Sequence, residues 1–382
     1  MDFELTQKQK KIQKTAADFV KSELEPLAAE LDRTKNREKL LAVLRKLAEL
    51  GFMGITIDPQ YGGTGADTVS FSLAMTEIGR GCSSTGVTAS VTNMVAEVIQ
   101  AVGAQELREK YIPPLCSGEF AAGGFALTET IAGSDPAGMR MSAVPDGDHW
   151  VLDGQKIFIS SAEFAGVFVV WAVTDKEARK GKGISAFLVE PSFPGFRVGQ
   201  LEKKLGQLAS PTNELIFDNC RVPKENLLGV HNDGFRIAAS ELAGGRIGIG
   251  SMALGIGLAA MDFAAKYAKE QMQGNETLAG RQDVRSIIAE NYTRLEGARL
   301  LLLRASSLKD QKKFYAKEAS MSKVYATEAA NKACHDALQI VGDYGYTQGC
   351  PVERFYRDAR VTMIYEGTSE IQRLIIAREL LR

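Results

Sequence analysis

The stretch Val151–Val189, VLDGQKIFISSAEFAGVFVVWAVTDKEARKGKGISAFLV, decides the fold class of this chain. It consists of short runs of β-branched and aromatic residues that are separated by turn-forming pairs such as Asp153-Gly154. The runs lie at residues 151–152, 157–159, 167–171 and 184–189, and another lies at 215–217. Closely spaced strands without helices between them predict an antiparallel sheet or a small barrel rather than a Rossmann unit.

Helical segments flank this sheet on both sides. Before it, Thr6 and Gln9 predict a capping box, and apolar residues keep one face from Ile12 to Leu27. After it, the small residues of Ile247–Gly255 indicate a helix that packs closely on others. Two long amphipathic helices are predicted to follow, at residues 285–312 and 316–341.

The order helix, strand, helix predicts an α+β chain that is mainly helical. We expect an N-terminal α-helical domain at residues 1–120, a middle antiparallel β-domain at 121–235 and a C-terminal four-helix-bundle domain at 236–382. The outer segments are expected to come together as one bundle with the sheet beside it.

The composition is that of a globular protein. Its 382 residues are 45% hydrophobic and 24% charged, which argues against disorder. The net charge is −1 and Lys and Arg form no block, so we expect no nucleic-acid partner. The five cysteines are scattered without a Cys-x-x-Cys pair, which favours free thiols over disulfides or a metal site. Without a leader or a run of ~18 apolar residues, we expect a cytoplasmic protein with no membrane contact.

Two segments near the sheet have residues that suit a flavin. Phe125–Asp135 contains hydroxyls, a glycine and backbone N–H groups of the kind that hold a polar ring edge and a diphosphate. Asp153–Ser161 places Phe158 and Ser160 two residues apart, hence on one face of a strand, as an aromatic wall with a hydrogen-bond donor. Taken alone, each segment is better explained as a turn or as a hairpin with a core aromatic.

The carboxy-terminal tail carries the specific signal. It reads QIVGDYGY at 339–346, PVERFYRDAR at 351–360 and IYEGTSEIQR at 364–373. Together with the two earlier segments and the DNCRVPKEN stretch at 218–226, these motifs have the order and approximate spacing of the acyl-CoA dehydrogenases. Essentially the whole chain resembles this family.

The resemblance implies FAD as the cofactor, held between the β-domain and the C-terminal helices. It implies that Thr128 and Ser134 contact the isoalloxazine edge and the diphosphate, that Phe158 stacks on the ring, and that Ser160 bonds its reducible nitrogen. The positions that match contacts to the nucleotide part are Gln339, Gly342, Thr368 and Glu370. The positions that match substrate contacts are Arg246 and Gly367.

The resemblance also implies that Glu366 is the catalytic base of an α,β-dehydrogenation that yields a 2-enoyl-CoA, with hydride passing to FAD. The α-proton of a thioester is weakly acidic, so a carboxylate in a dry pocket, with a raised pKa, suits its removal. Some members take the base from the helix that begins at the Gly-Gly-Arg segment. Here Gly244 and Gly245 have no side chain, so Glu366 is the sole candidate.

Three departures from the family pattern stand out. Thr130-Ile131 replaces a Pro-Gly pair near the flavin edge, and Ala243 replaces an aspartate that contacts pantetheine in many members. Gln271–Asn275 replaces an Arg-x-Gln-Phe-Gly stretch that reaches the FAD of a neighbouring subunit. A Gln in place of that Arg is expected to cost roughly 1.5–3 kcal/mol of FAD binding.

Several functional alternatives remain open at this point. The segment Ser83–Met94 matches the helix that lines the acyl pocket and lacks Arg and Lys, so we expect a short, branched or alicyclic neutral acyl-CoA. The resemblance implies an electron-transfer flavoprotein as acceptor and a homotetramer or homodimer. Altered chemistry, as in an oxidase, an enoyl-CoA reductase or a desulfinase, is the alternative enzyme. A non-catalytic CoA-binding subunit is the non-enzymatic one.

Overall fold

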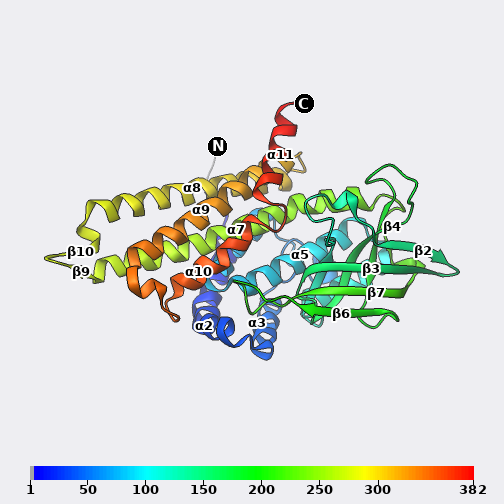
Figure 1. Ribbon diagram of the computed structural model, residues 1–382, viewed down its shortest axis with the longest axis horizontal. Coiled ribbons are helices and arrows are strands. Elements are labelled where there is room, and N and C mark those ends of the chain that lie inside the picture. The colour runs from blue at the N-terminus through cyan, green and yellow to red at the C-terminus, as the bar shows by residue number, and fades with distance from the viewer. Residues whose placement is uncertain (1–3) are drawn as a thin grey trace.

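In the computed structural model, which describes residues 4–382, a body of long helices carries a β-sheet at one end (Figure 1). The N-terminal helices are α1 (Gln7–Phe19), α2 (Glu25–Thr34), α3 (Arg37–Glu49), α4 (Thr68–Gly81), α5 (Ser83–Val102) and α6 (Gln105–Ser117). The C-terminal helices are α7 (Gly234–Glu270), α8 (Gln282–Asp310), α9 (Ala316–Val341), α10 (Pro351–Arg360) and α11 (Ser369–Leu380). The predicted mainly helical α+β fold class is confirmed.

Local sequence signals fix several helix ends. The capping box at the start of α1 is confirmed, because Thr6 Oγ1 accepts from the Gln9 backbone at 3.2 Å and Gln9 Oε1 accepts from the Thr6 backbone at 2.8 Å. Helix α9 has the predicted bounds, whereas α8 runs over Gln282–Asp310 rather than over the predicted 285–312.

The middle segment forms one sheet with the strand order β6-β7-β3-β2-β4-β5-β8, and β1 pairs with β4. Its strands are β1 (Ala122–Ala126), β2 (Ser142–Asp146), β3 (His149–Ser160), β4 (Ala165–Val173), β5 (Ile184–Val189), β6 (Phe196–Leu201), β7 (Thr212–Pro223) and β8 (Leu227–Leu228). The pairings are antiparallel except β1–β4 and β2–β4, which are parallel. A short hairpin of β9 (Met272–Gln273) and β10 (Glu276–Thr277) joins α7 to α8.

The predicted turn at Asp153-Gly154 is wrong. Both residues lie inside β3, which runs through as one long strand. The register against β7 shifts between Leu152 and Gly154, and Gly154 has φ +140°. Glycine here marks a β-bulge, because this backbone conformation is open to a residue without a Cβ.

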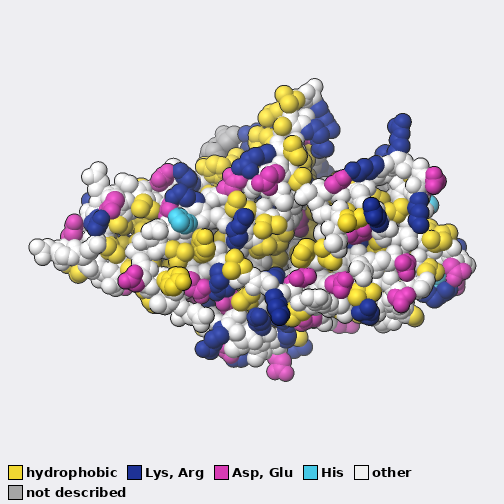
Figure 2. Space-filling view, in the orientation of Figure 1, with side chains coloured by type: hydrophobic (Ala, Val, Ile, Leu, Met, Phe, Trp, Pro, Cys, Tyr) yellow, Lys and Arg dark blue, Asp and Glu magenta, His cyan; other side chains and the backbone are white. Residues whose placement is uncertain are grey.

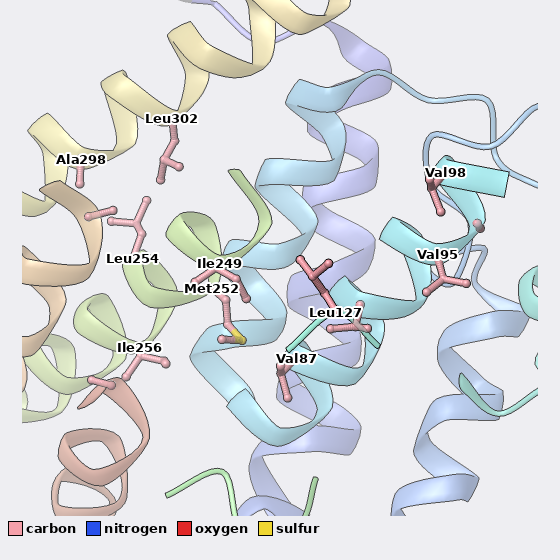
Figure 3. Packing of buried hydrophobic residues seen from close by; sticks show 14 of the residues in the cluster. Val87, Val95, Val98, Leu127, Ile249, Met252, Leu254, Ile256, Ala298 and Leu302 are labelled. Atoms are coloured by element: carbon pink, nitrogen blue, oxygen red, sulfur yellow. The ribbon is translucent and has the colours of Figure 1, made fainter. Parts of the chain in front are cut away.

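One hydrophobic core joins the N-terminal and C-terminal helices (Figure 3). Val87 and Val95 of α5 belong to the same buried cluster as Ile249 of α7 and Leu302 of α8. Burying each such side chain stabilises the folded protein by roughly 1.5–3 kcal/mol. Because the N-terminal and C-terminal helices share this buried cluster, they form one bundle. The prediction that they come together is confirmed.

Small residues let α7 approach α4 closely, as the sequence indicated. A Cβ on Gly79 would lie 2.5 Å from Met252 O, and one on Gly255 would lie 2.0 Å from Thr76 O. By length and composition α7 is apolar enough to cross a membrane, which the sequence patterns did not predict, but 78% of its apolar window is buried inside this fold. The five cysteines are free and buried.

Candidate functional site

A cavity of about 650 Å³ lies between the sheet and the segment that joins α10 to α11. On the face shown in Figure 2, hydrophobic side chains gather between the helices and the sheet, while charged groups of both signs are spread around them. The cavity brings together predicted site residues from distant parts of the chain. These are Thr128, Ser134, Phe158, Ser160, Glu366, Gly367 and Thr368.

The end of β3 supplies an aromatic wall. Phe158 is 59% exposed, which is unusual for a phenylalanine on a central strand, and it has φ +58°. The register against β7 is broken between Lys156 and Ile159, which marks a β-bulge at this point of β3. Ile159 is buried, whereas Phe158 and Ser160 on either side of it both line the cavity, so the two lie on one face of the strand as predicted.

A buried ion pair connects the two segments on the sheet side of the cavity. Lys156 Nζ, on β3, lies 2.9 Å from Glu129 Oε1 and 3.1 Å from Leu127 O. Glu129 also accepts from the backbone N–H groups of Arg140 (2.7 Å) and Met141 (3.0 Å). Burial lowers the pKa of Lys156 to about 8, and the neighbouring Glu129 acts in the opposite direction. The pair fixes Thr128 relative to Phe158.

Glu366 faces the cavity from the opposite side. It keeps some accessible surface because it borders this space, but its Oε2 is shielded and has no hydrogen-bond partner in the described chain. Burial raises the pKa of Glu366 to about 7, while the cations of Arg246 on α7 and Lys323 on α9 act in the opposite direction. A half-shielded carboxyl with such a pKa can take a proton from a bound molecule at neutral pH.

Hydrogen bonds to carbonyl groups hold the segment around Glu366. Lys323 Nζ donates to Gly367 O at 2.8 Å. Gln372 Nε2 donates to Glu366 O at 3.0 Å and to Gly367 O at 2.9 Å. Glu366 has φ +54°, a left-handed conformation that is uncommon outside glycine, so these bonds stabilise a strained backbone.

The remaining predicted residues lie elsewhere. Gln339 and Gly342 line a second cavity, of about 470 Å³, at the end of α9. Glu370 is exposed in the first turn of α11 and borders neither cavity. Arg246 is buried behind Glu366, and its Nε has no partner in the described chain. Their roles at FAD and substrate stay predictions.

Two ionisable residues close to Glu366 were not found from the sequence. Lys323 sits on the buried face of α9 among Ala319, Ser322 and Ala326, and a lone lysine among small buried residues is a signal that was available. Glu241, one turn before Gly245 on α7, has a pKa raised by burial and by Glu97, and its Oε1 has no partner in the described chain. Nothing in its local sequence distinguishes it from an exposed helix residue.

The main cavity fits the tricyclic ring of a flavin. Phe158, which is largely exposed, lines it with an apolar ring, and Thr128 and Ser160 are hydroxyl-bearing residues of the same lining. Cavities of this size, apolar with a few convergent polar groups, are typical of cofactor sites.

Comparisons with known proteins agree with this geometry. The chain matches the family models described as acyl-CoA dehydrogenase, N-terminal domain (residues 6–119), middle domain (124–220) and C-terminal domain (232–381). It is 45% identical over 382 residues to the short-chain specific acyl-CoA dehydrogenase, mitochondrial, of Rattus norvegicus, covering 99% of this chain and 91% of the relative.

Two solved structures are similar over the full length of both chains. Butyryl-CoA dehydrogenase from Megasphaera elsdenii superposes with a TM-score of 0.97 at 37% identity, covering 100% of each chain. A chain in a structure named for the electron transferring flavoprotein of Acidaminococcus fermentans gives a TM-score of 0.97 at 41% identity, again covering 100% of each chain.

Proposed function

Because this chain belongs to the acyl-CoA dehydrogenase family, we propose that it desaturates a short, branched or alicyclic neutral acyl-CoA with Glu366 as the base. The chain is an FAD-dependent oxidoreductase by its family. The observation that carries the finer proposal is the carboxyl of Glu366. It lies across one cavity from Phe158 and Ser160, with a pKa of about 7.

Glu366 takes the α-proton in this proposal. Substrate binding expels water from around a carboxylate that is already shielded, which raises its affinity for a proton further. The cations of Arg246 and Lys323 keep enough of Glu366 ionised at neutral pH to act as a base. When bound, FAD supplies the two-electron acceptor for the β-hydrogen.

The developing enolate oxygen needs hydrogen-bond donors that are already in place. In the described chain the backbone N–H of Glu366 donates to no protein acceptor, so it is free to donate to the thioester oxygen. The bonds from Lys323 and Gln372 to the carbonyl groups of residues 366 and 367 fix the direction of this N–H. The same segment thus provides both the base and an oxyanion donor.

The acyl group is proposed to be neutral because residues 83–94 of α5, which the resemblance places beside the acyl chain, carry no charged side chain. Every residue from Ser83 to Met94 is buried, and none is Arg or Lys. A distal carboxylate, as in a glutaryl group, would be desolvated there without a cation to pair with. The name of the rat relative, short-chain specific, supports a small acyl group.

For the oxidative half-reaction we propose an electron-transfer flavoprotein as acceptor. The similar Acidaminococcus fermentans structure is named for such a protein, which supports this choice. A homotetramer or homodimer is proposed from the family resemblance alone, and light scattering of the purified holoenzyme measures this oligomeric state. A cytoplasmic location is proposed because the five cysteines are free thiols, which suits a reducing compartment.

An anaerobic screen of acyl-CoAs tests the proposed activity. Butyryl-CoA, isobutyryl-CoA, cyclohexanecarboxyl-CoA and glutaryl-CoA are mixed in turn with the holoenzyme, and bleaching of the bound flavin is followed. We expect one or more neutral esters to bleach it, with formation of the 2-enoyl-CoA, and glutaryl-CoA to react slowest. Fastest bleaching by glutaryl-CoA would refute the neutral pocket, and no bleaching by any ester would refute the dehydrogenation.

A further inference from the structure

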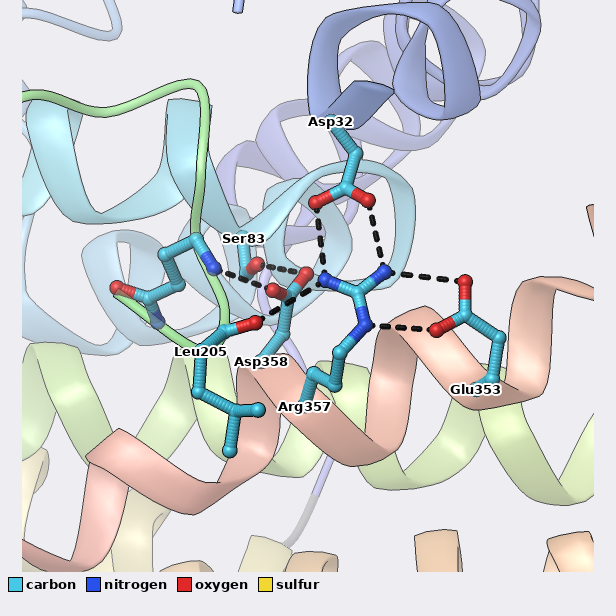
Figure 4. Close-up of polar contacts among 7 residues, drawn as sticks. Asp32, Ser83, Leu205, Glu353, Arg357 and Asp358 are labelled. Atoms are coloured by element: carbon cyan, nitrogen blue, oxygen red, sulfur yellow. Dashed lines mark hydrogen bonds and ion pairs between the residues drawn. The ribbon is translucent and has the colours of Figure 1, made fainter. Parts of the chain in front are cut away.

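Two consecutive residues of α10, Arg357 and Asp358, join three distant parts of the chain (Figure 4). Arg357 Nη2 lies 2.7 Å from Asp32 Oδ2 on α2, and Arg357 Nη1 donates to Leu205 O at 3.3 Å. Asp358 accepts from Ser83 Oγ of α5 at 2.6 Å and from the backbone N–H of Gln207. The loop of residues 202–211, between β6 and β7, is thereby held against α10.

Asp358 is a strong anchor for this loop. It is 4% exposed, so it is almost fully removed from water. Burial raises its pKa to about 6, and the donors from Gln207 and Ser83 act in the opposite direction. The side chain is therefore mainly ionised at neutral pH, and a carboxylate in an apolar setting binds a backbone N–H firmly.

The 202–211 loop has a strained backbone where it meets α10. Gln207 has φ +50°, and a Cβ on Gly206 would lie 2.4 Å from Arg357 O. Such strain persists only where the surroundings enforce it, and it gathers at functional sites. Here it directs the side chain of Gln207 toward the cavity, where Nε2 donates to Tyr365 Oη at 3.0 Å.

Tyr365 immediately precedes Glu366 in the chain. Burial keeps the pKa of the Tyr365 phenol above its usual range, so the ring remains a neutral hydrogen-bond partner. Both Gln207 and Tyr365 line the same cavity as Glu366. The carbonyl groups of 366 and 367 are fixed from the far side by Lys323 and Gln372, so the Gln207 bond restrains this segment from the β-domain side.

We propose that Gln207 is a positioning residue, which through its hydrogen bond to Tyr365 holds the Glu366 carboxylate in place for proton removal. The inference rests on the proposed role of Glu366. Misplacing a reacting group by about 1 Å can lower the reaction rate on the order of a hundredfold. Loss of the hydrogen bond between Gln207 and Tyr365 should therefore lower turnover more than it weakens substrate binding.

The charged groups around Glu366 lie outside this restraint. They are Arg246 and Glu241 on α7 and Lys323 on α9, and none of them bonds Gln207. Removing the Gln207 bond should therefore lower the rate of proton removal without moving the pH at which Glu366 titrates. A general loss of packing would instead change both the binding of the acyl-CoA and the pH at which Glu366 titrates.

A double-mutant cycle tests the proposal. Gln207→Met keeps the shape of the side chain without its amide, and Tyr365→Phe removes only the phenol oxygen. We expect each to slow flavin reduction by saturating butyryl-CoA, or whichever ester the parent prefers, about tenfold, with KM within about threefold. The double variant should be no slower than the slower single variant, because both remove one hydrogen bond.

Gln200→Met is the matched control, since Gln200 is exposed on β6, and its rate should equal the parent's. Unchanged rates in both single variants, or effects that multiply in the double variant, would overturn the positioning role. If Gln207→Met does not fold with FAD, Tyr365→Phe alone decides by the same rate and KM criteria. If no acyl-CoA bleaches the flavin of the parent enzyme, the proposed function is refuted instead.

Discussion

Glu366 Oε2 lies directly against Gly245 of α7, so close that a Cβ on Gly245 would be 2.7 Å from this oxygen. The same Cβ would lie 2.8 Å from Met94 Sδ on α5. The shielded oxygen of Glu366, the proposed base, therefore rests on a helix surface that only glycine provides.

Gly245→Ala is expected to displace the Glu366 carboxylate. The added methyl overlaps Oε2, so turnover should fall at least tenfold, by the loss of base positioning. Gly244→Ala is the matched control, because its Cβ would meet the ends of two flexible side chains, Lys309 Nζ at 3.0 Å and Glu97 Oε2 at 3.6 Å. Steady-state kinetics measure the turnover of the two variant holoenzymes. Equal losses of turnover in both variants would contradict this role of Gly245.

Glu366→Gln is expected to remove the base while preserving the shape of the site. Turnover should fall by about 10²–10⁴, the usual contribution of a general base, while FAD and acyl-CoA still bind. Flavin absorbance and the spectral change on adding acyl-CoA measure the binding. A variant that turns over close to the parent's rate would reject Glu366 as the base.

The pH dependence follows from the raised pKa of Glu366. The base must be ionised, so kcat/KM should rise with pH through about 7 and then level off. Burial favours the protonated form of this carboxyl. Glu366 is therefore neutralised, and activity is lost, as the pH falls below about 7. A profile in which activity persists down to pH ~4.5, near the ordinary range of a glutamate, would show that the carboxyl is not shielded.

Lys156→Met is expected to destabilise the sheet side of the site. It leaves Glu129 buried without its cation, which costs about 3–5 kcal/mol of unfolding free energy. FAD affinity should fall too, because the pair fixes Thr128 against the strand that carries Phe158. Denaturant unfolding measures the free energy of unfolding. Lys180→Met, in an exposed pair with Asp135, is the control, and a similar loss there would contradict the prediction.

Gln271→Arg is expected to tighten FAD binding by about tenfold to a hundredfold, since a charge-assisted bond to a diphosphate contributes roughly 1.5–3 kcal/mol. Gln271 directly follows α7 and is exposed beside the β9–β10 hairpin, where the resemblance implies a neighbouring subunit's FAD. Titration of the apoprotein with FAD measures the affinity. Gln60→Arg adds the same charge at a distant exposed turn and should leave affinity unchanged. An equal effect of both variants would show only a general charge effect.

Patterns of neighbouring residues were enough to predict the fold class. The capping box at Thr6 and the runs such as 167–171 depend on contacts within a few residues, and these contacts survive in the structure. The predicted turn at Asp153-Gly154 is wrong, and neither bulge of β3 was predicted. A bulge is decided by the partner strand β7 and by the loop that packs on it, which no local pattern contains.

For the site, the sequence by itself determined which residue types were available: a glutamate at 366, an aromatic at 158, and glycines at 244 and 245. Only the tertiary structure decided the chemistry they can support. Burial raises the pKa of Glu366, and the nearby cations of Arg246 and Lys323, which come from α7 and α9, act in the opposite direction. Desolvation and Coulomb interaction depend on which distant segments meet in space, so they appear only once the chain has folded.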